Sequence, residues 1–209
     1  KEITADLLKL FTALNKRTVA KGFKHLIVSP LESRNKFYNL INREIRIAKS
    51  GKPAYMILKV NSLADEGMVR KLYDASNAGV NVKLIVRGIC CLVPGVPGFS
   101  ENIKVISIID KFLEHARVFI FGNEGKEEMF LSSADLMTRN FEHRVEVGFP
   151  VLDHEVRQEI KDIIEFQLQD NVKARDINRN QNNKYHKNRL STKVRAQVQT
   201  YNYLKTKHQ

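Results

Sequence analysis

The chain has 209 residues, 43% of them hydrophobic, and its 35 Lys and Arg against 23 Asp and Glu give a net charge of +12. Apolar stretches recur at regular intervals, so the chain can build a core, and intrinsic disorder of the whole chain is excluded. The apolar run around 84–93 is cut by Arg87 and ended by Pro94. It falls well short of the roughly 20 residues that a membrane-spanning helix needs.

The positive charge is concentrated near the C-terminus. The last 39 residues contain ten Lys and Arg and one acid, Asp176, so they carry +9 of the net charge. This segment predicts a polyanionic partner, but charge does not choose between nucleic acid, an anionic membrane and a simpler polyanion. The adjacent Cys90 and Cys91 have neither disulfide nor metal-ligand spacing, so we interpret them as core residues in a reducing cytosol.

A helix is predicted over the first fifteen residues, and the chain starts at Lys1 inside this amphipathic pattern, as expected of a piece of a longer protein. Strands and helices then alternate. We expect strands at 25–28, 54–60, 82–86, 104–109, 116–121, 129–132 and 144–149, helices ending near 50, 79 and 168, an extended segment at 175–191 and a helix at 192–206. The pattern predicts an α/β fold with a mixed β-sheet flanked by helices, plus a basic C-terminal extension ending in a helix.

The segment 112–119 is the most informative part of the sequence. On a strand, His115 and Arg117 would point to the same face, about 6.6 Å apart, while Ala116 and Val118 face the other way. An arginine fork neutralises phosphate, and histidine can donate a proton or attack phosphorus. The alternative interpretation is a surface histidine beside a solvated arginine.

Three further arginines are candidates for contacts with an anion. Arg87 follows the strand at 82–86, and ligands of open α/β sheets gather at the carboxyl ends of strands. Arg144 shares a predicted strand face with Glu146, where an exposed ion pair is the simpler interpretation. Arg139 follows the segment 132–135, whose two serines and one aspartate could approach an anion or merely cap a turn.

Other catalytic chemistries find no support in the sequence. It contains no Walker-type glycine run, no GxSxG motif and no His/Cys cluster with metal-ligand spacing, so we predict no metal site in this chain.

Several stretches together resemble the C-terminal part of bacterial polyphosphate kinase of the long-chain, histidine-phosphorylated type. The resemblance covers nearly the entire chain. The stretches that carry it are VSP at 28–30, LIVRGIC at 84–90, ISIID at 106–110, FLEH at 112–115, SSAD at 132–135, MTRN at 137–140, RVEV at 144–147, VKAR at 172–175 and KVRAQ at 193–197.

The resemblance implies a domain organisation. The chain would be the second of two phospholipase D-like domains at 28–170, preceded at 1–27 by the end of the first such domain. The basic C-terminal extension at 171–209 would contain the helix at 192–206. In that superfamily two His-x-Lys motifs meet across a pseudo-twofold axis. Here His115–Ala116–Arg117 takes that place, with Arg for Lys and Gly122 where the motif's acid is expected, which makes phosphodiester hydrolysis less expected than a kinase reaction.

The resemblance also implies a function: reversible transfer of the ATP γ-phosphate to inorganic polyphosphate through a phosphohistidine. His115 and Arg87 match positions that contact ATP phosphates, and His115 would exchange a proton with a phosphate oxygen. From strand face and charge, we infer that Arg117, Arg139 and Arg144 line the path of the polyphosphate. The phosphorylated histidine and the Mg²⁺ ligands are expected upstream of Lys1, so the isolated fragment is predicted to be inactive.

The expected partners are therefore ATP or ADP, polyphosphate and the rest of the polyphosphate kinase chain, in a homo-oligomer without specific nucleic acid. The expected location is the cytoplasm, with peripheral association at the inner membrane as an option. The alternative function is a non-catalytic module that binds nucleic acid or polyphosphate. Stacking modules place aromatic residues among basic ones, whereas the tail has only three tyrosines, at 185, 201 and 203.

Overall fold

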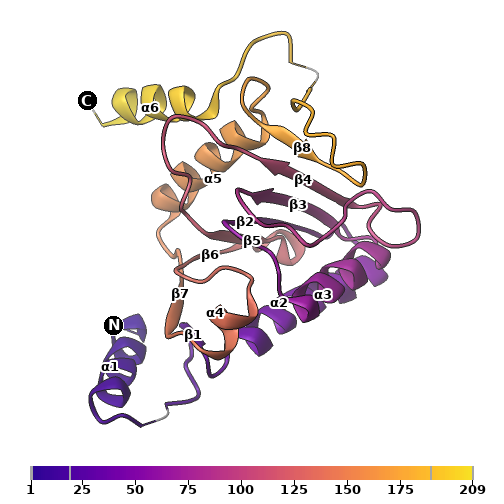
Figure 1. The fold of residues 1–209 in the computed structure, drawn as a ribbon. Helices are drawn as coiled ribbons and strands as arrows, with labels where there is room; N and C mark the ends of the chain where they lie inside the picture. Colours follow the sequence, from indigo (N-terminus) through magenta and orange to yellow (C-terminus); the bar gives the residue numbers. More distant parts are fainter. Residues whose placement is uncertain (1, 19, 189, 209) are drawn as a thin grey trace.

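A computed structural model describes residues 2–18, 20–188 and 190–208 (Figure 1). The helices are α1 (Glu2–Asn15), α2 (Ser33–Lys49), α3 (Glu66–Asn77), α4 (Thr138–Glu142), α5 (His154–Leu168), α6 (Ala196–Lys207) and the 3₁₀ turn η1 (Asn123–Gly125). The strands are β1 (Ile27–Ser29), β2 (Tyr55–Val60), β3 (Asn81–Val86), β4 (Ile103–Ser107), β5 (Val118–Phe121), β6 (Glu128–Ser132), β7 (Glu146–Pro150) and β8 (Arg175–Ile177).

The eight strands form one sheet in the order β1-β7-β6-β5-β2-β3-β4-β8. The pairs β2–β3 and β3–β4 are parallel, and the other neighbours are antiparallel. The predicted α/β fold with a mixed sheet is therefore confirmed. Because β2 and β3 are parallel, the segments that follow them leave the sheet at the same edge, which is where such sheets hold ligands.

Helices cover both faces of the sheet (Figure 1). On one face α2 and α3 bury Phe37 and Leu72 against strand residues that include Phe119. On the other face α5 and the first residue of α6 contribute Ile164 and Ala196 to a second core. Strands covered on both sides need nearly continuous apolar sequence, which explains the run at 82–86.

Several predicted elements begin later in the structure than the sequence pattern indicated, among them the strand expected at 25–28, which is β1, Ile27–Ser29. The strand expected at 116–121 is β5, which begins at Val118, because Val118 lies opposite Lys59, the last β2 residue in that pairing. The strand expected at 144–149 is β7, Glu146–Pro150. The helix expected at 192–206 is α6, Ala196–Lys207: Val194 stays extended by exchanging two hydrogen bonds with Asn171.

The two ends of the chain pack in different ways. Helix α1 buries Leu10 and Ala13, while Leu8 and Phe11 remain exposed. At the other end, β8 extends the sheet beside β4, and α6 packs along α5 through the rings of Phe166 and Tyr203. No helix among the described residues is both long and apolar enough to cross a membrane.

Candidate functional site

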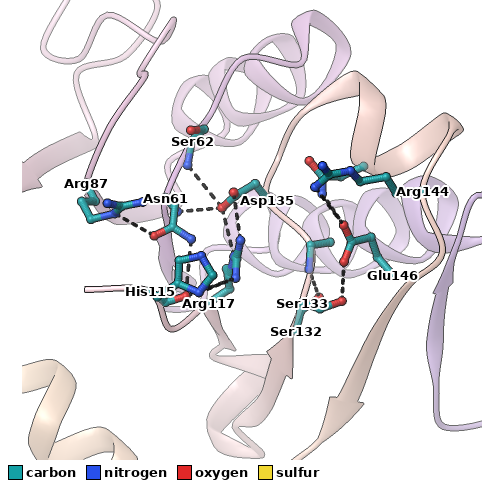
Figure 2. Close-up of polar contacts among 12 residues, drawn as sticks. Asn61, Ser62, Arg87, His115, Arg117, Ser132, Ser133, Asp135, Arg144 and Glu146 are labelled. Atoms are coloured by element: carbon teal, nitrogen blue, oxygen red, sulfur yellow. Dashed lines mark hydrogen bonds and ion pairs between the residues drawn. The ribbon is translucent and has the colours of Figure 1, made fainter. Parts of the chain in front are cut away.

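The candidate site lies where the chain leaves the carboxyl ends of β2 and β3 (Figure 2). Asn61 follows β2, Arg87 follows β3, and His115 belongs to the loop before β5. The Arg87 Nε donates to Asn61 Oδ1 at 2.9 Å, and Asn61 Nδ2 donates to the His115 carbonyl at 3.4 Å. The buried Asn61 thus links the two residues that the family resemblance assigned to the ATP phosphates.

A second set of contacts orients Arg117. Its Nε and Nη2 donate to the two carboxylate oxygens of Asp135, both at 3.2 Å. The same carboxylate accepts the backbone N–H groups of Asn61 and Ser62, at 2.7 and 3.3 Å. Asp135 is buried, so this bidentate pair fixes Arg117 against the end of β2.

Arg117 in turn orients the imidazole. Its Nη1 lies 3.3 Å from His115 Nδ1 and 3.3 Å from the His115 carbonyl oxygen. A guanidinium has no acceptor, so Nδ1 accepts this hydrogen bond and the proton of a neutral imidazole resides on Nε2. The His115 side chain is exposed, and Nε2 is therefore a donor available to an incoming phosphate oxygen.

The charge balance of this group favours an anion. Arg117 is neutralised by Asp135, but among the described residues no carboxylate forms an ion pair with Arg87, whose Nε donates to the neutral side chain of Asn61. Arg87 is half-buried, so its charge is only partly screened by water. An unpaired guanidinium in such a position has the charge and donor geometry to bind phosphate.

Arg139 and Arg144 lie apart from this group. Arg144 is exposed and stands 3.9 Å from Glu146 Oε1. Glu146 is held by Ser133 and by Asn140 Nδ2, the latter at 2.6 Å. Arg139 is exposed on the short helix α4. Among the described residues, no contact joins either arginine to His115, so their place on a polyphosphate path stays a prediction.

Two cavities in the structure do not match the chemistry of a phosphate site. One of about 500 Å³ opens beside His115 between α5, α6 and the loop before β5, and apolar residues such as Leu131 and Ile164 predominate in its lining. The other, about 660 Å³, lies at the amino ends of β2 and β3, around Tyr55 and Asn81. The guanidinium groups of Arg87 and Arg117 lie instead beside Asn61, at the carboxyl end of β2.

The residues around His115 do not fit a Mg²⁺ site. Across the described parts of the chain, no three His, Cys, Asp or Glu side chains come together as metal ligands. Arg87, which has no carboxylate partner among the described residues, makes the surroundings positive, which suits phosphate and opposes a cation.

Asn61 was not identified by the sequence analysis. It comes directly after the strand predicted at 54–60, a position where ligands gather, and this placement was the available signal. Asp135 was weighed only as an anion-site residue or a cap of its own turn. It serves instead as the acceptor for Arg117, 18 residues away in the sequence, and for the backbone of Asn61, 74 residues away.

A search against protein families matches residues 26–197 to the model described as "Polyphosphate kinase C-terminal domain 2". The chain belongs to the polyphosphate kinase family. It is 48% identical over 204 residues to the polyphosphate kinase of Vibrio cholerae and 44% identical over 201 residues to that of Bacillus cereus. These alignments cover 98% and 96% of this chain but only 29% of each polyphosphate kinase, so the chain spans less than a third of those relatives.

Solved structures agree with this assignment. The polyphosphate kinase of Porphyromonas gingivalis matches 99% of the chain with a TM-score of 0.93 and 47% identity, and the match takes up 32% of that protein. NucT from Helicobacter pylori and Nuc from Salmonella typhimurium, a phospholipase D family member, align with TM-scores of 0.52 and 0.51 at 20% and 14% identity. These two matches show that the fold is phospholipase D-like.

Proposed function

We propose that this chain is the part of a polyphosphate kinase that binds the ATP phosphates during reversible transfer of the γ-phosphate to polyphosphate. The observation that carries the proposal is the convergence of Arg87, His115 and Arg117 on Asn61 and Asp135 at one edge of the sheet. Phosphoryl transfer depends mainly on positioning and charge neutralisation, and these residues provide both.

Each residue has a distinct role in the proposal. Arg87 binds an ATP phosphate oxygen through the guanidinium nitrogens that do not bond to Asn61. His115 donates from Nε2 to a phosphate oxygen and exchanges that proton during transfer. Arg117 orients the imidazole rather than binding phosphate, because Asp135 already neutralises it. Mg²⁺, with ligands expected elsewhere in the full-length protein, would neutralise part of the nucleotide charge when bound.

The direct test is polyphosphate synthesis by the full-length protein that contains this chain, supplied with ATP and Mg²⁺. We expect a polymer that grows with time, and ADP formed in proportion. The reverse reaction, ATP formation from ADP and polyphosphate, should occur with the same preparation. Failure of both reactions in a folded full-length protein would contradict the proposal.

We expect Arg87→Lys to raise the KM for ATP about tenfold while the protein stays folded. Lysine keeps the charge but loses the planar fork that can hold Asn61 and phosphate together, and hydrogen bonds to charged groups contribute about 1.5–3 kcal/mol each. The matched control is Arg70→Lys on α3, which changes only an exposed i,i+4 pair with Glu66. A KM that is the same in both variants would exclude Arg87 from ATP binding.

The alternative, a non-catalytic module for nucleic acid, finds less support in the tail. Tyr185 stacks on the Arg175 guanidinium, 3.3 Å from its central carbon to the ring centroid. Tyr203 packs edge-on against Phe166. Two of the three tyrosines in the C-terminal extension thus contact other side chains of the protein.

A salt-dependent titration with single-stranded DNA and with polyphosphate of equal charge separates the kinase function from a nucleic-acid-binding module. A preference for DNA would favour the binding module.

A further inference from the structure

The loop between β4 and β5, residues 108–117, carries His115 and is held from one side by the start of α6 (Figure 1). Arg195, just before α6, forms a bidentate ion pair with Asp110 at 2.6 and 2.8 Å. Gln197 accepts from the Phe112 backbone N–H at 2.9 Å and donates to the Phe112 carbonyl at 2.8 Å. Its Nε2 also donates to Glu114 Oε1 at 2.8 Å, one residue before His115.

A buried lysine holds the same loop from beneath. Lys59 Nζ donates to Glu114 Oε2 at 2.7 Å and to Gln167 Oε1 at 2.9 Å. Gln167 in turn donates to Glu114 Oε2 at 3.2 Å. Burial lowers the pKa of Lys59, and the Glu114 carboxylate opposes this shift. Glu114 is thus held from two directions, by β2 and α5 on one side and by α6 on the other.

Beyond Ile108, which is buried in the second core, burial of apolar surface contributes little to the position of this loop. Ile109, Phe112 and Leu113 are 73%, 64% and 69% exposed. Polar contacts therefore fix the loop, and the hydrogen bonds of Arg195 hold the pKa of the Asp110 carboxyl below its usual value. Loss of one such contact removes a large share of the restraint on the backbone before His115.

The start of α6 is itself firmly anchored. The fully buried Asp170 accepts the backbone N–H of Ala196 at 2.7 Å, and it also accepts the N–H groups of residues 172–174. Further along α6, Tyr203 donates to Asp162 of α5 at 2.7 Å. Because these contacts do not involve Gln197 or Arg195, α6 can stay docked when either side chain is changed.

From these contacts we propose that Arg195 and Gln197 are positioning residues that hold the His115 loop in the geometry needed for phosphate transfer. This inference rests on the proposed role of His115. It assigns part of the basic C-terminal segment to the organisation of the active site rather than to retention of a polyanion. The two residues touch the loop backbone and its acids, and they act on the reaction only through His115.

The test uses the full-length protein and the variant Gln197→Ala. We expect kcat/KM for polyphosphate synthesis to fall about tenfold, since three hydrogen bonds to the loop are lost and a displacement near 1 Å can cost about 10²-fold. Amide hydrogen exchange at 109–114 should become faster. The matched control is Gln199→Ala, which makes the same substitution at an exposed glutamine two residues further along α6. It should change neither quantity.

A double-mutant cycle with His115→Ala separates positioning from general structural damage. If Gln197 acts through His115, Gln197→Ala should change the residual rate of the His115→Ala protein by less than about twofold. An undiminished tenfold loss in that background would overturn the inference while leaving the role of His115 intact. A wild-type rate in the single variant Gln197→Ala would also overturn it. A wild-type rate for His115→Ala would instead contradict the proposed function, and the positioning role with it.

Discussion

Replacing His115 with alanine in the full-length protein is expected to slow polyphosphate synthesis from ATP by about 10²–10³-fold. This is the range found when one preorganised donor to a developing charge is removed, about 2.7–4 kcal/mol. In the structure, Arg117 bonds to Nδ1, so Nε2 is left as the donor in the proposed contact with phosphate. Initial rates of ADP release and polymer formation, measured at saturating ATP, provide the readout.

His154→Ala is the matched control for the loss of a histidine side chain. His154 is exposed at the start of α5, far in sequence from the contacts around Asn61 and Asp135. His154→Ala should leave the rate unchanged. If His115→Ala retained the wild-type rate, the assignment of His115 would be wrong. Equal losses in both variants would point to a general effect of histidine removal on folding.

The second large effect is expected at Asp135. Asp135→Ala leaves the Arg117 charge without its partner and two backbone N–H groups without an acceptor, in a region where both side chains are largely buried. Removal of one partner of such a pair costs about 3–5 kcal/mol. The free energy of unfolding of the 209-residue chain, measured with urea, should fall by that amount.

Two further variants show whether the unpaired charge is the cause. Adding Arg117→Met to Asp135→Ala should restore part of the lost stability, because no buried charge is then left alone. Asp153→Ala removes an exposed N-cap, whose carboxylate accepts the Val156 N–H, and should cost only about 1 kcal/mol. An Asp135→Ala loss no larger than this N-cap value would contradict the assigned role of Asp135.

Much of the fold could be predicted from local pattern. The continuous apolar run that became β3 indicated a strand covered on both faces, and the alternation of strands and helices indicated the parallel pairs beside it. The ends of the elements were harder to predict from the sequence. Phe112 and Leu113, in the loop before β5, are apolar residues of a kind that is usually buried, yet both are exposed, and Gln197 of α6 holds the Phe112 backbone by two hydrogen bonds.

The candidate site was predictable only in part. Spacing placed His115 and Arg117 together, and they do lie together, although ahead of the strand rather than on it. The partners that orient them come from distant sequence: the backbone N–H of Asn61 donates to the carboxylate of Asp135. A lone aspartate such as Asp135 or Asp170 resembles a turn cap, so its long-range acceptor role becomes visible only in three dimensions.

Strand β8 has a consequence for how the sheet meets other molecules. It pairs antiparallel with β4 from Val105 to Ser107 and so covers the outer edge of an apolar strand. A chain shortened before residue 171 would leave that edge free to pair with strands of neighbouring molecules, a common route to aggregation. The short replacement edge carries Arg175 and Asp176, and charged side chains on a brief strand discourage such pairing. The C-terminal segment thus also protects the protein against edge-to-edge association.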